Sequence, residues 1–249
     1  MALVCLLAAC GGGDDTPTVI GPPSETADIS LLFMGNSHSQ SNGLQGMVAE
    51  LVGAAKAPLT AESIAAPGWM FLDERVNHVP SIRLLHNQDW AFVVLQAQKY
   101  STTGCCTYST DEAKDLVRQA REQHAVPILF PEWPLRGVAE TMKIYNLHVS
   151  IAQDEPACVA PIGQAWDLSM ARHPGIDLYA DDGNHSEPNG AYLTALILFA
   201  TMTGISPLDA GDIDPFYTVG PETQALLRQV AADTVADWPP RQWCPGDPY

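Results

Sequence analysis

Buried strands and helices alternate along this chain, and that alternation limits the possible folds more than any other feature of the sequence. Five short apolar stretches are typical of strands, at 28–36, 59–65, 90–96, 126–130 and 158–162. Helical spacing of apolar residues occurs between them, at 43–55, 110–124 and 139–153. The first strand stretch, DISLLFMGN, is an almost continuous apolar run, as expected of a strand buried on both faces. The sequence therefore predicts the α/β class, as a three-layer α/β/α sandwich around a mainly parallel five-stranded sheet.

Two more helices are predicted near the end of the chain, at 188–204 and 221–238. The first of them, PNGAYLTALILFATMTG, is apolar almost all round. This pattern indicates a helix buried against the sheet rather than one that spans a membrane. Gly204 and Pro207 provide the residues that end it.

Polar residues follow the predicted strands at the ends where such sheets bind their ligands. In open parallel sheets the binding crevice lies outside the carboxyl ends of the strands. Ser37 follows the first predicted strand, Gly68 the second and Glu132 the fourth, while Gln96 ends the third. The loop YADDGNHSEPNG comes after the fifth. We expect these groups to meet at one rim of the sheet.

Ser37, Asp182 and His185 are the residue types of a nucleophilic triad. A serine hydroxyl needs a base to accept its proton and an acidic group to hold that base in one tautomer. Asp182 and His185 are three positions apart in one turn, so the carboxylate can hold Nδ1 and leave Nε2 for Ser37. Alone, Ser37 would be an ordinary helix cap and D-x-x-H a chance match, but together they favour catalysis. His38 is expected to point away from Ser37 because adjacent strand residues face opposite ways.

At these positions the sequence resembles the SGNH/GDSL hydrolase superfamily. Family members carry a serine after the first strand, a glycine after the second, an asparagine after the third and a D-x-x-H before the final helix. Gly35-Asn36-Ser37, Gly68 and Asp182 with His185 correspond to the first, second and last of these. Two motifs resemble a bacterial branch of the superfamily, known mainly as domains of unknown function, more closely. They are VVLQ at 93–96 and DGNHSEPNGAYLTA at 182–195. The resemblance covers about residues 30–207 and implies a flavodoxin-like SGNH hydrolase fold.

The resemblance also implies a serine esterase that needs no metal or organic cofactor. Its oxyanion hole would consist of the backbone N–H groups of Ser37 and Gly68 and a side-chain amide after the third strand. No G-x-N-D occurs there, so we expect Gln96 to replace the asparagine, with Gln98 as the alternative. The residues expected to contact substrate are His38, Gln98, Glu132 and Trp133.

The expected substrate is a small-molecule or glycan ester, with a short acyl group or a carbohydrate O-acetyl group. The rim is polar and the sequence has no long apolar lid segment. A lipid esterase of the lysophospholipase kind is one alternative. A surface glycan-binding protein that has lost turnover is another, for which the missing G-x-N-D is the main argument.

The first ten residues, MALVCLLAAC, resemble a bacterial lipoprotein signal. That resemblance implies a signal peptide at 1–9, a lipidated Cys10, a flexible tether at 10–27 and a hydrolase domain at 28–249. We therefore expect an exported monomer, anchored in the cell envelope only through the lipid at Cys10. The net charge of −17, with 12 lysines and arginines, argues against binding nucleic acid or an anionic membrane through a basic face.

Export would place the remaining cysteines in a compartment that permits disulfides. Cys158 begins the fifth predicted strand, at the end of the sheet opposite the expected site, whereas Cys105 and Cys106 follow the third strand at the site rim. A bridge from Cys158 to Cys244 is therefore the easier pairing. Cys105 and Cys106 would then bond each other or stay reduced. No pair of cysteines has the spacing of a zinc site.

Overall fold

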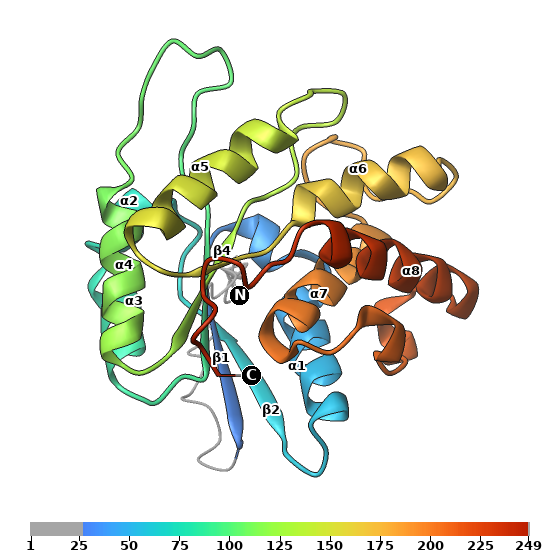
Figure 1. Cartoon of the computed structure of the whole chain (residues 1–249), viewed down its shortest axis with the longest axis horizontal. Coiled ribbons are helices and arrows are strands. Elements are labelled where there is room, and N and C mark those ends of the chain that lie inside the picture. The colour runs from blue at the N-terminus through green and yellow to red at the C-terminus, as the bar shows by residue number, and fades with distance from the viewer. Residues whose placement is uncertain (1–26, 249) are drawn as a thin grey trace, which may run out of the picture.

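A computed structural model of the chain describes residues 27–248. The expected signal peptide, the lipidation site Cys10 and nearly all of the expected tether lie outside the described residues. Within them, the structure is of the predicted α/β class, with a five-stranded sheet between two layers of helices (Figure 1).

All five strands of the sheet are parallel. They are β1 (Ile29–Met34), β2 (Ala61–Ala65), β3 (Phe92–Gln96), β4 (Val126–Phe130) and β5 (Cys158–Val159). Their order is β2-β1-β3-β4-β5. The chain therefore places β2 on one side of β1 and then adds β3, β4 and β5 on the other side. This order is that of flavodoxin-like folds, in which ligands bind where the direction reverses. Here that point is the carboxyl end of β1, between β2 and β3.

Alternate strand residues face opposite layers, because successive side chains of a strand point to opposite sides of the sheet. Phe33 and Val94 lie in one core with α1 (Leu44–Ala55), α6 (Ile162–Arg172), α7 (Pro188–Thr203) and α8 (Pro221–Asp237). Leu32 and Val93 lie in the other core. That core also contains α2 (Leu72–Arg75), α3 (Val79–His86), α4 (Asp111–Glu122) and α5 (Thr141–Asp154). Figure 1 shows α3 and α4 on one side of the sheet and α1, α7 and α8 on the other.

Helix α7 is buried along nearly its whole length, as its sequence predicts. Pro188 occupies its first turn, where the missing N–H leaves no acceptor unsatisfied. The helix ends at Gly204, whose φ of +66° is a left-handed conformation that favours glycine. No helix within residues 27–248 combines the length and the apolar character that crossing a bilayer requires.

Three helices were not expected from the sequence. Helices α2 and α3 occupy the segment between β2 and β3, and α6 begins at Ile162, directly after Pro161. The fifth strand is consequently shorter than predicted, since it contains only Cys158 and Val159. Four 3₁₀ turns complete the described secondary structure, at Ser37–Ser39, Ser41–Gly43, Pro207–Asp209 and Pro215–Tyr217.

The cysteine pairing agrees with the expectation from the sequence. Cys158 and Cys244 form a disulfide that ties the C-terminal segment to the edge strand β5. The Pro240 carbonyl also accepts a hydrogen bond from Val159 N at 2.9 Å. Cys105 and Cys106 are free and exposed, in the long loop after β3 that stands out at the top of Figure 1. A hydrogen bond from Cys106 lowers the pKa of Cys105 to about 7.

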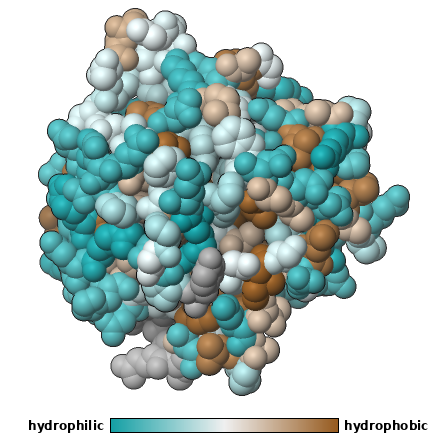
Figure 2. Space-filling view, viewed as in Figure 1, coloured by the Kyte–Doolittle hydropathy of each residue, from teal (hydrophilic) through white to brown (hydrophobic). Residues whose placement is uncertain are grey.

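The surface seen in Figure 2 is mainly hydrophilic or intermediate, with hydrophobic residues interspersed among polar ones. Several large apolar side chains are nevertheless exposed in loops. Trp69, which follows the candidate oxyanion residue Gly68, is 71% exposed.

Candidate active site

Ser37 lies at the carboxyl end of β1, where it begins the first 3₁₀ turn. The side chain of Asn36 caps this turn, because its Oδ1 accepts a hydrogen bond from His38 N at 3.0 Å. Gly35 allows a close approach of the backbone to β3, since a Cβ there would collide with the side chains of Gln96 and Ser39. Ser37 is therefore held at a tight turn at the switch point of the sheet.

The structure brings the three predicted triad residues together. Ser37 Oγ lies 2.8 Å from His185 Nε2, and His185 Nδ1 lies 2.5 Å from Asp182 Oδ2. Asp182 Oδ1 also accepts hydrogen bonds from the backbone N–H groups of Asn184 and His185, at 2.8 and 2.9 Å. Gly183, with φ of +68°, makes the tight turn between them. This series of contacts has the geometry of nucleophile, base and orienting acid.

The carboxyl group of Asp182 is suited to holding a histidine that gains a proton. Its pKa lies well below the ordinary value, mainly because of the hydrogen bond from His185 and also because of the two backbone N–H donors. Asp182 is therefore ionised at neutral pH. An ionised carboxylate at Nδ1 fixes the tautomer of His185 in which Nε2 faces Ser37.

His38 and Trp133 support the loop that carries His185. The carbonyl of Asn184 accepts hydrogen bonds from Trp133 Nε1 at 2.8 Å and from His38 Nε2 at 3.2 Å. The His38 ring stacks on that of His185 at a centroid distance of 5.2 Å, and Trp133 stacks on Trp166 at 4.1 Å. Burial is the main cause that lowers the pKa of His38, followed by the neighbouring His185.

The expectation that His38 and Trp133 contact substrate is not supported by this geometry. Trp133 is 2% exposed and His38 9% exposed, and each side chain is committed to Asn184. Both side chains hold the loop of His185 through the carbonyl of Asn184. The backbone carbonyl of Asn184, which the sequence did not single out, is the group that connects them to His185.

Two backbone N–H groups at the site are available to hold an oxyanion. Neither Ser37 N nor Gly68 N donates a hydrogen bond to any acceptor within residues 27–248. Gly68 has φ of +78°, and a Cβ there would lie 2.8 Å from Met70 Cε. These are the backbone donors that the sequence predicted.

The structure does not place Gln96 as the third donor. Its side chain is fully buried beneath the Ser37 turn, where Oε1 accepts a hydrogen bond from Asn36 N at 2.7 Å. Its Nε2 donates to Glu132 Oε2 at 2.5 Å. Gln96 thus supports the turn that carries Ser37, and both ends of its carboxamide are occupied.

Gln98 is not a substitute for Gln96 in this structure. Its side chain is 5% exposed and its Nε2 donates to the carbonyls of Lys99 and Ser109, at 3.0 and 2.9 Å. It therefore stabilises the loop after β3 rather than facing a substrate. The turn between Gln96 and Gln98 contains Ala97 at φ of +77°, so the two amides do not continue a regular strand.

Glu132 is partly buried beside Gln96, at the carboxyl end of β4. Burial raises its pKa to about 7, although the hydrogen bond from Gln96 favours the ionised form. Glu132 thus changes charge near neutral pH at the base of the site. Whether it also contacts a substrate, as the sequence suggested, stays a prediction.

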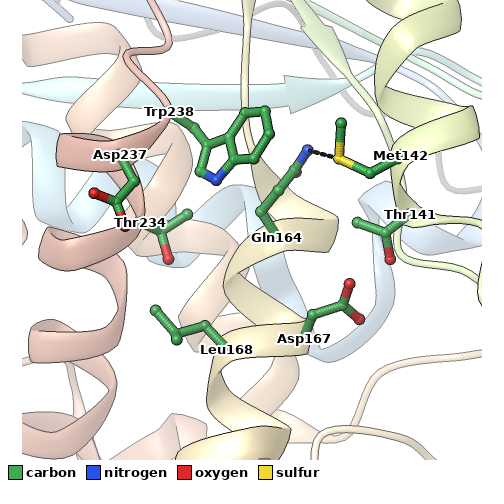
Figure 3. Close-up of a pocket in the computed structure, with 8 residues that line it drawn as sticks. All are labelled: Thr141, Met142, Gln164, Asp167, Leu168, Thr234, Asp237 and Trp238. Carbon is green, nitrogen blue, oxygen red and sulfur yellow. Dashed lines mark hydrogen bonds between the residues drawn. The ribbon is translucent and has the colours of Figure 1, made fainter.

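A separate cavity of about 370 Å³ lies between α5, α6 and α8 (Figure 3). Gln164, Asp167 and Trp238 point toward it, and Gln164 Nε2 contacts the sulfur of Met142. None of the triad residues lines this cavity. It is therefore distinct from the site at Ser37.

Comparison with known proteins agrees with the fold. No protein-family model and no curated protein matches the sequence. A protein from Slackia heliotrinireducens, provisionally described as an SGNH hydrolase, is 28% identical and has a TM-score of 0.58; the match covers 70% of this chain and 98% of that one.

Two further solved structures, both less than 25% identical, share the fold. A DUF4886 family protein from Bacteroides uniformis has a TM-score of 0.62 at 17% identity, over 85% of this chain and 95% of its own. The protein TesA has a TM-score of 0.53 at 14% identity, over 70% of this chain and 98% of its own. Strand order and these similarities show that the chain has the fold of the SGNH/GDSL hydrolases, and the likeness to the Slackia heliotrinireducens protein supports that superfamily.

Proposed function

We propose that this protein is a serine esterase in which Ser37, His185 and Asp182 form the catalytic triad. One observation supports this most strongly: the hydrogen bonds from Ser37 Oγ to His185 Nε2, at 2.8 Å, and from His185 Nδ1 to Asp182, at 2.5 Å. A helix-capping serine needs neither contact. The position of Ser37 at the switch point of the sheet supports the same function.

The reaction would proceed by acyl transfer to the serine and then to water. His185 Nε2 accepts the proton of Ser37 as Oγ attacks the ester carbonyl, and the N–H groups of Ser37 and Gly68 hold the oxyanion. The imidazolium of His185, held by the ionised Asp182, then protonates the leaving alcohol. Water attacks the acyl-enzyme in the same way, and its proton passes through His185 back to Ser37.

We propose a short-chain acyl ester, and first a carbohydrate O-acetyl ester, as the substrate. The side chain of Trp69 is 71% exposed directly after Gly68, and its Nε1 donates to Gln40 Oε1 at 3.2 Å. That hydrogen bond fixes an exposed flat aromatic surface beside the site, on which the apolar face of a sugar ring can stack.

A second candidate function is glycan binding without turnover. The engagement of Gln96 with Asn36 and Glu132 favours it, because the side-chain amide that was expected to hold the oxyanion is then occupied. Removing one oxyanion donor from a hydrolase typically lowers the rate about 100- to 1,000-fold. An esterase with these two donors is thus expected to be slower than one with three.

We also propose that the protein is exported and held at the cell envelope through Cys10. Support comes from the disulfide between Cys158 and Cys244, since such bonds persist in oxidising compartments and are rare in the cytosol. Labelling bacteria that produce the protein with radioactive palmitate tests this proposal. We expect incorporation that the change Cys10→Ala abolishes.

Hydrolysis of p-nitrophenyl acetate tests the esterase function. We expect activity in the wild-type protein and its loss in Ser37→Ala and in His185→Ala. Ser150→Ala and His86→Ala are matched controls, because Ser150 lies on the exposed side of α5 and His86 is an exposed residue of α3 that forms a hydrogen bond with Gln119. Wild-type activity no higher than that of Ser37→Ala would favour the glycan-binding function.

The acyl and alcohol parts of the substrate need separate assays. Acetyl esters should be hydrolysed faster than octanoyl esters, and acetylated xylan should release acetate. Trp69→Ala should raise KM for the acetylated glycan and leave p-nitrophenyl acetate hydrolysis nearly unchanged, because the small ester does not need a stacking surface. A preference for octanoyl esters would favour the lipid esterase alternative.

A further inference from the structure

We propose that Arg75 is a positioning residue of the oxyanion hole. It links the turn that carries Ser37 to the turn that carries Gly68. The inference rests on the proposed esterase function and adds a residue to it. Arg75 ends the four-residue helix α2 and its side chain is fully buried.

The guanidinium of Arg75 joins two turns that follow different strands, β1 and β2. A single nitrogen, Nη2, donates to the carbonyl of Gly35 at 2.5 Å and to the carbonyl of Gly68 at 2.6 Å. The other, Nη1, donates to the carbonyl of Pro67 at 3.2 Å and to Ser81 Oγ at 2.7 Å. The turns after β1 and β2 therefore share one fixed donor.

The carbonyls that Arg75 holds are close along the backbone to the two N–H groups that would bind the oxyanion. Gly68 N and Gly68 O belong to the same residue, and Gly35 O is one peptide unit before Ser37 N. Peptide units are planar, so fixing the direction of a carbonyl limits the rotation of the neighbouring units. Both glycines lack side chains that could fix these turns. Arg75 supplies this constraint.

The helix that carries Arg75 is itself fixed to the site. Leu72 N donates to the carbonyl of Ala97 at 3.0 Å, at the end of β3. Glu74 accepts a hydrogen bond from Phe71 N at 3.0 Å, which closes the first turn of the helix. Arg75 thus connects the ends of β1 and β2 from a position fixed to the end of β3.

The charge of Arg75 is buried without a carboxylate partner. Among the described residues, no acidic oxygen lies within 4.0 Å of its guanidinium, and its Nε, also buried, makes no hydrogen bond. Burial lowers its pKa to about 10, so the group stays protonated at neutral pH. A buried, unpaired cation is costly to a fold unless something compensates it.

The oxyanion of the transition state is a negative charge that would form beside this cation. Hydrogen bonds in a chain polarise one another, so donation from Arg75 Nη1 to the Pro67 carbonyl, which shares a peptide unit with Gly68 N, makes that N–H a stronger donor. The positive charge would act in the transition state more than in the ground state, which is the condition for lowering the barrier. It would partly offset the absence of a free side-chain amide at Gln96.

Steady-state kinetics of Arg75→Gln and Arg75→Lys test this role. We expect kcat to fall about 100-fold in Arg75→Gln, with KM changed less than about threefold, because misplacing the donors affects mainly the transition state. Arg75→Lys keeps the charge but not the fork of donors, so we expect an intermediate loss. Activities are compared per folded molecule, from circular dichroism at the assay temperature.

Inhibition by phenylboronic acid separates positioning from a purely structural role. Boron bonded to Ser37 Oγ places an oxygen where the oxyanion would lie, so the inhibition constant should rise by the same factor as kcat/KM falls. Arg228→Gln is the matched control, because Arg228 is partly buried and contacts Tyr192, Gly211 and Asp212 away from the site. That variant should lose thermal stability and keep both constants within about twofold.

Three results would overturn the inference. One is kcat/KM within threefold of wild type in folded Arg75→Gln; another is a loss of kcat with unchanged boronic acid inhibition. Should Arg75→Gln fail to fold, wild-type kinetics in folded Arg75→Lys would overturn it equally. If the wild-type protein itself is no more active than Ser37→Ala, the proposed esterase function has failed rather than the role of Arg75 alone.

Discussion

Replacing Glu132 by glutamine should stabilise the protein above pH 7 and leave its stability nearly unchanged below pH 4.5. The carboxyl group of Glu132 accepts a hydrogen bond from Gln96 Nε2 at 2.5 Å in a partly buried position. Glutamine has almost the same shape and can accept that bond through its own carbonyl oxygen. The substitution Glu132→Gln therefore removes the buried negative charge and little else.

The expected magnitude follows from the pKa of Glu132. Burial raises this pKa from 4.5 to about 7, and each pH unit corresponds to about 1.4 kcal/mol, so the ionised form costs the fold about 3 kcal/mol. Below pH 4.5 the group is protonated in both the folded and the unfolded chain and the cost is absent. Between pH 4.5 and 7 the unfolded chain loses the proton first. Stability from Glu132 therefore falls with rising pH and is fully lost above about pH 7.

The pH dependence of the wild-type protein alone cannot show this effect, because His148 opposes it. His148 is fully buried, and burial lowers its pKa to about 4. The unfolded chain therefore binds the histidine proton more readily between about pH 4 and 6.5, and stability from His148 rises with pH there. Only the difference between Glu132→Gln and wild type isolates the carboxyl group.

Urea unfolding at pH 4.5, 5.5, 6.5 and 8 measures that difference. We expect Glu132→Gln to gain less than about 0.5 kcal/mol at pH 4.5 and about 2–3 kcal/mol at pH 8. Glu122→Gln, at the exposed end of α4, is the control and should show no such trend. A difference between Glu132→Gln and wild type that stays constant over this range, or that is largest at low pH, would refute the reasoning.

Three other variants have distinct expected results. Asp182→Asn should lower kcat on the order of 1,000- to 10,000-fold with little change in KM, because His185 loses the group that fixes its tautomer, and steady-state kinetics with p-nitrophenyl acetate would show this. The double change Cys158→Ala with Cys244→Ala should lower the free energy of unfolding by about 2–5 kcal/mol in urea and leave kcat within twofold, since the disulfide is far from Ser37 along the sheet. Gly35→Ala should cost about 1–3 kcal/mol and reduce activity, because its Cβ collides with Gln96 and Ser39; wild-type kinetics would contradict that contact.

The centre of the sheet was predictable because β1, β3 and β4 are largely buried on both faces. A mostly apolar run as short as that of β1 is typical of a buried strand, and the helices with a clear polar side, such as α4, have an obvious period. Helix α6 was missed because its buried face includes Gly163, Gln164 and Ser169, which hide the apolar period. Helices α2 and α3 were missed because they are short, so few apolar positions repeat.

At the site, the sequence predicted residue types and spacing better than side-chain direction. The Asp182–His185 turn is local, so its spacing alone defines the contact. The fate of Gln96 depends on Asn36 and Glu132, which are distant in the chain, and no local pattern shows that they occupy both ends of its amide. Arg75 carried no signal in the sequence either, since its partners are backbone carbonyls and these are the same for every residue type.

The large separation along the chain between Ser37 and His185 has a consequence for folding. The hydrogen bond between them joins residues 148 positions apart, so it forms only after most of the sheet and the loop before α7 are in place. Contacts of such long range form late, because the chain must first close a large loop. Ester hydrolysis during refolding should therefore recover after the helical circular dichroism signal, and a chain still emerging from the ribosome should stay inactive until the segment containing His185 is free to dock.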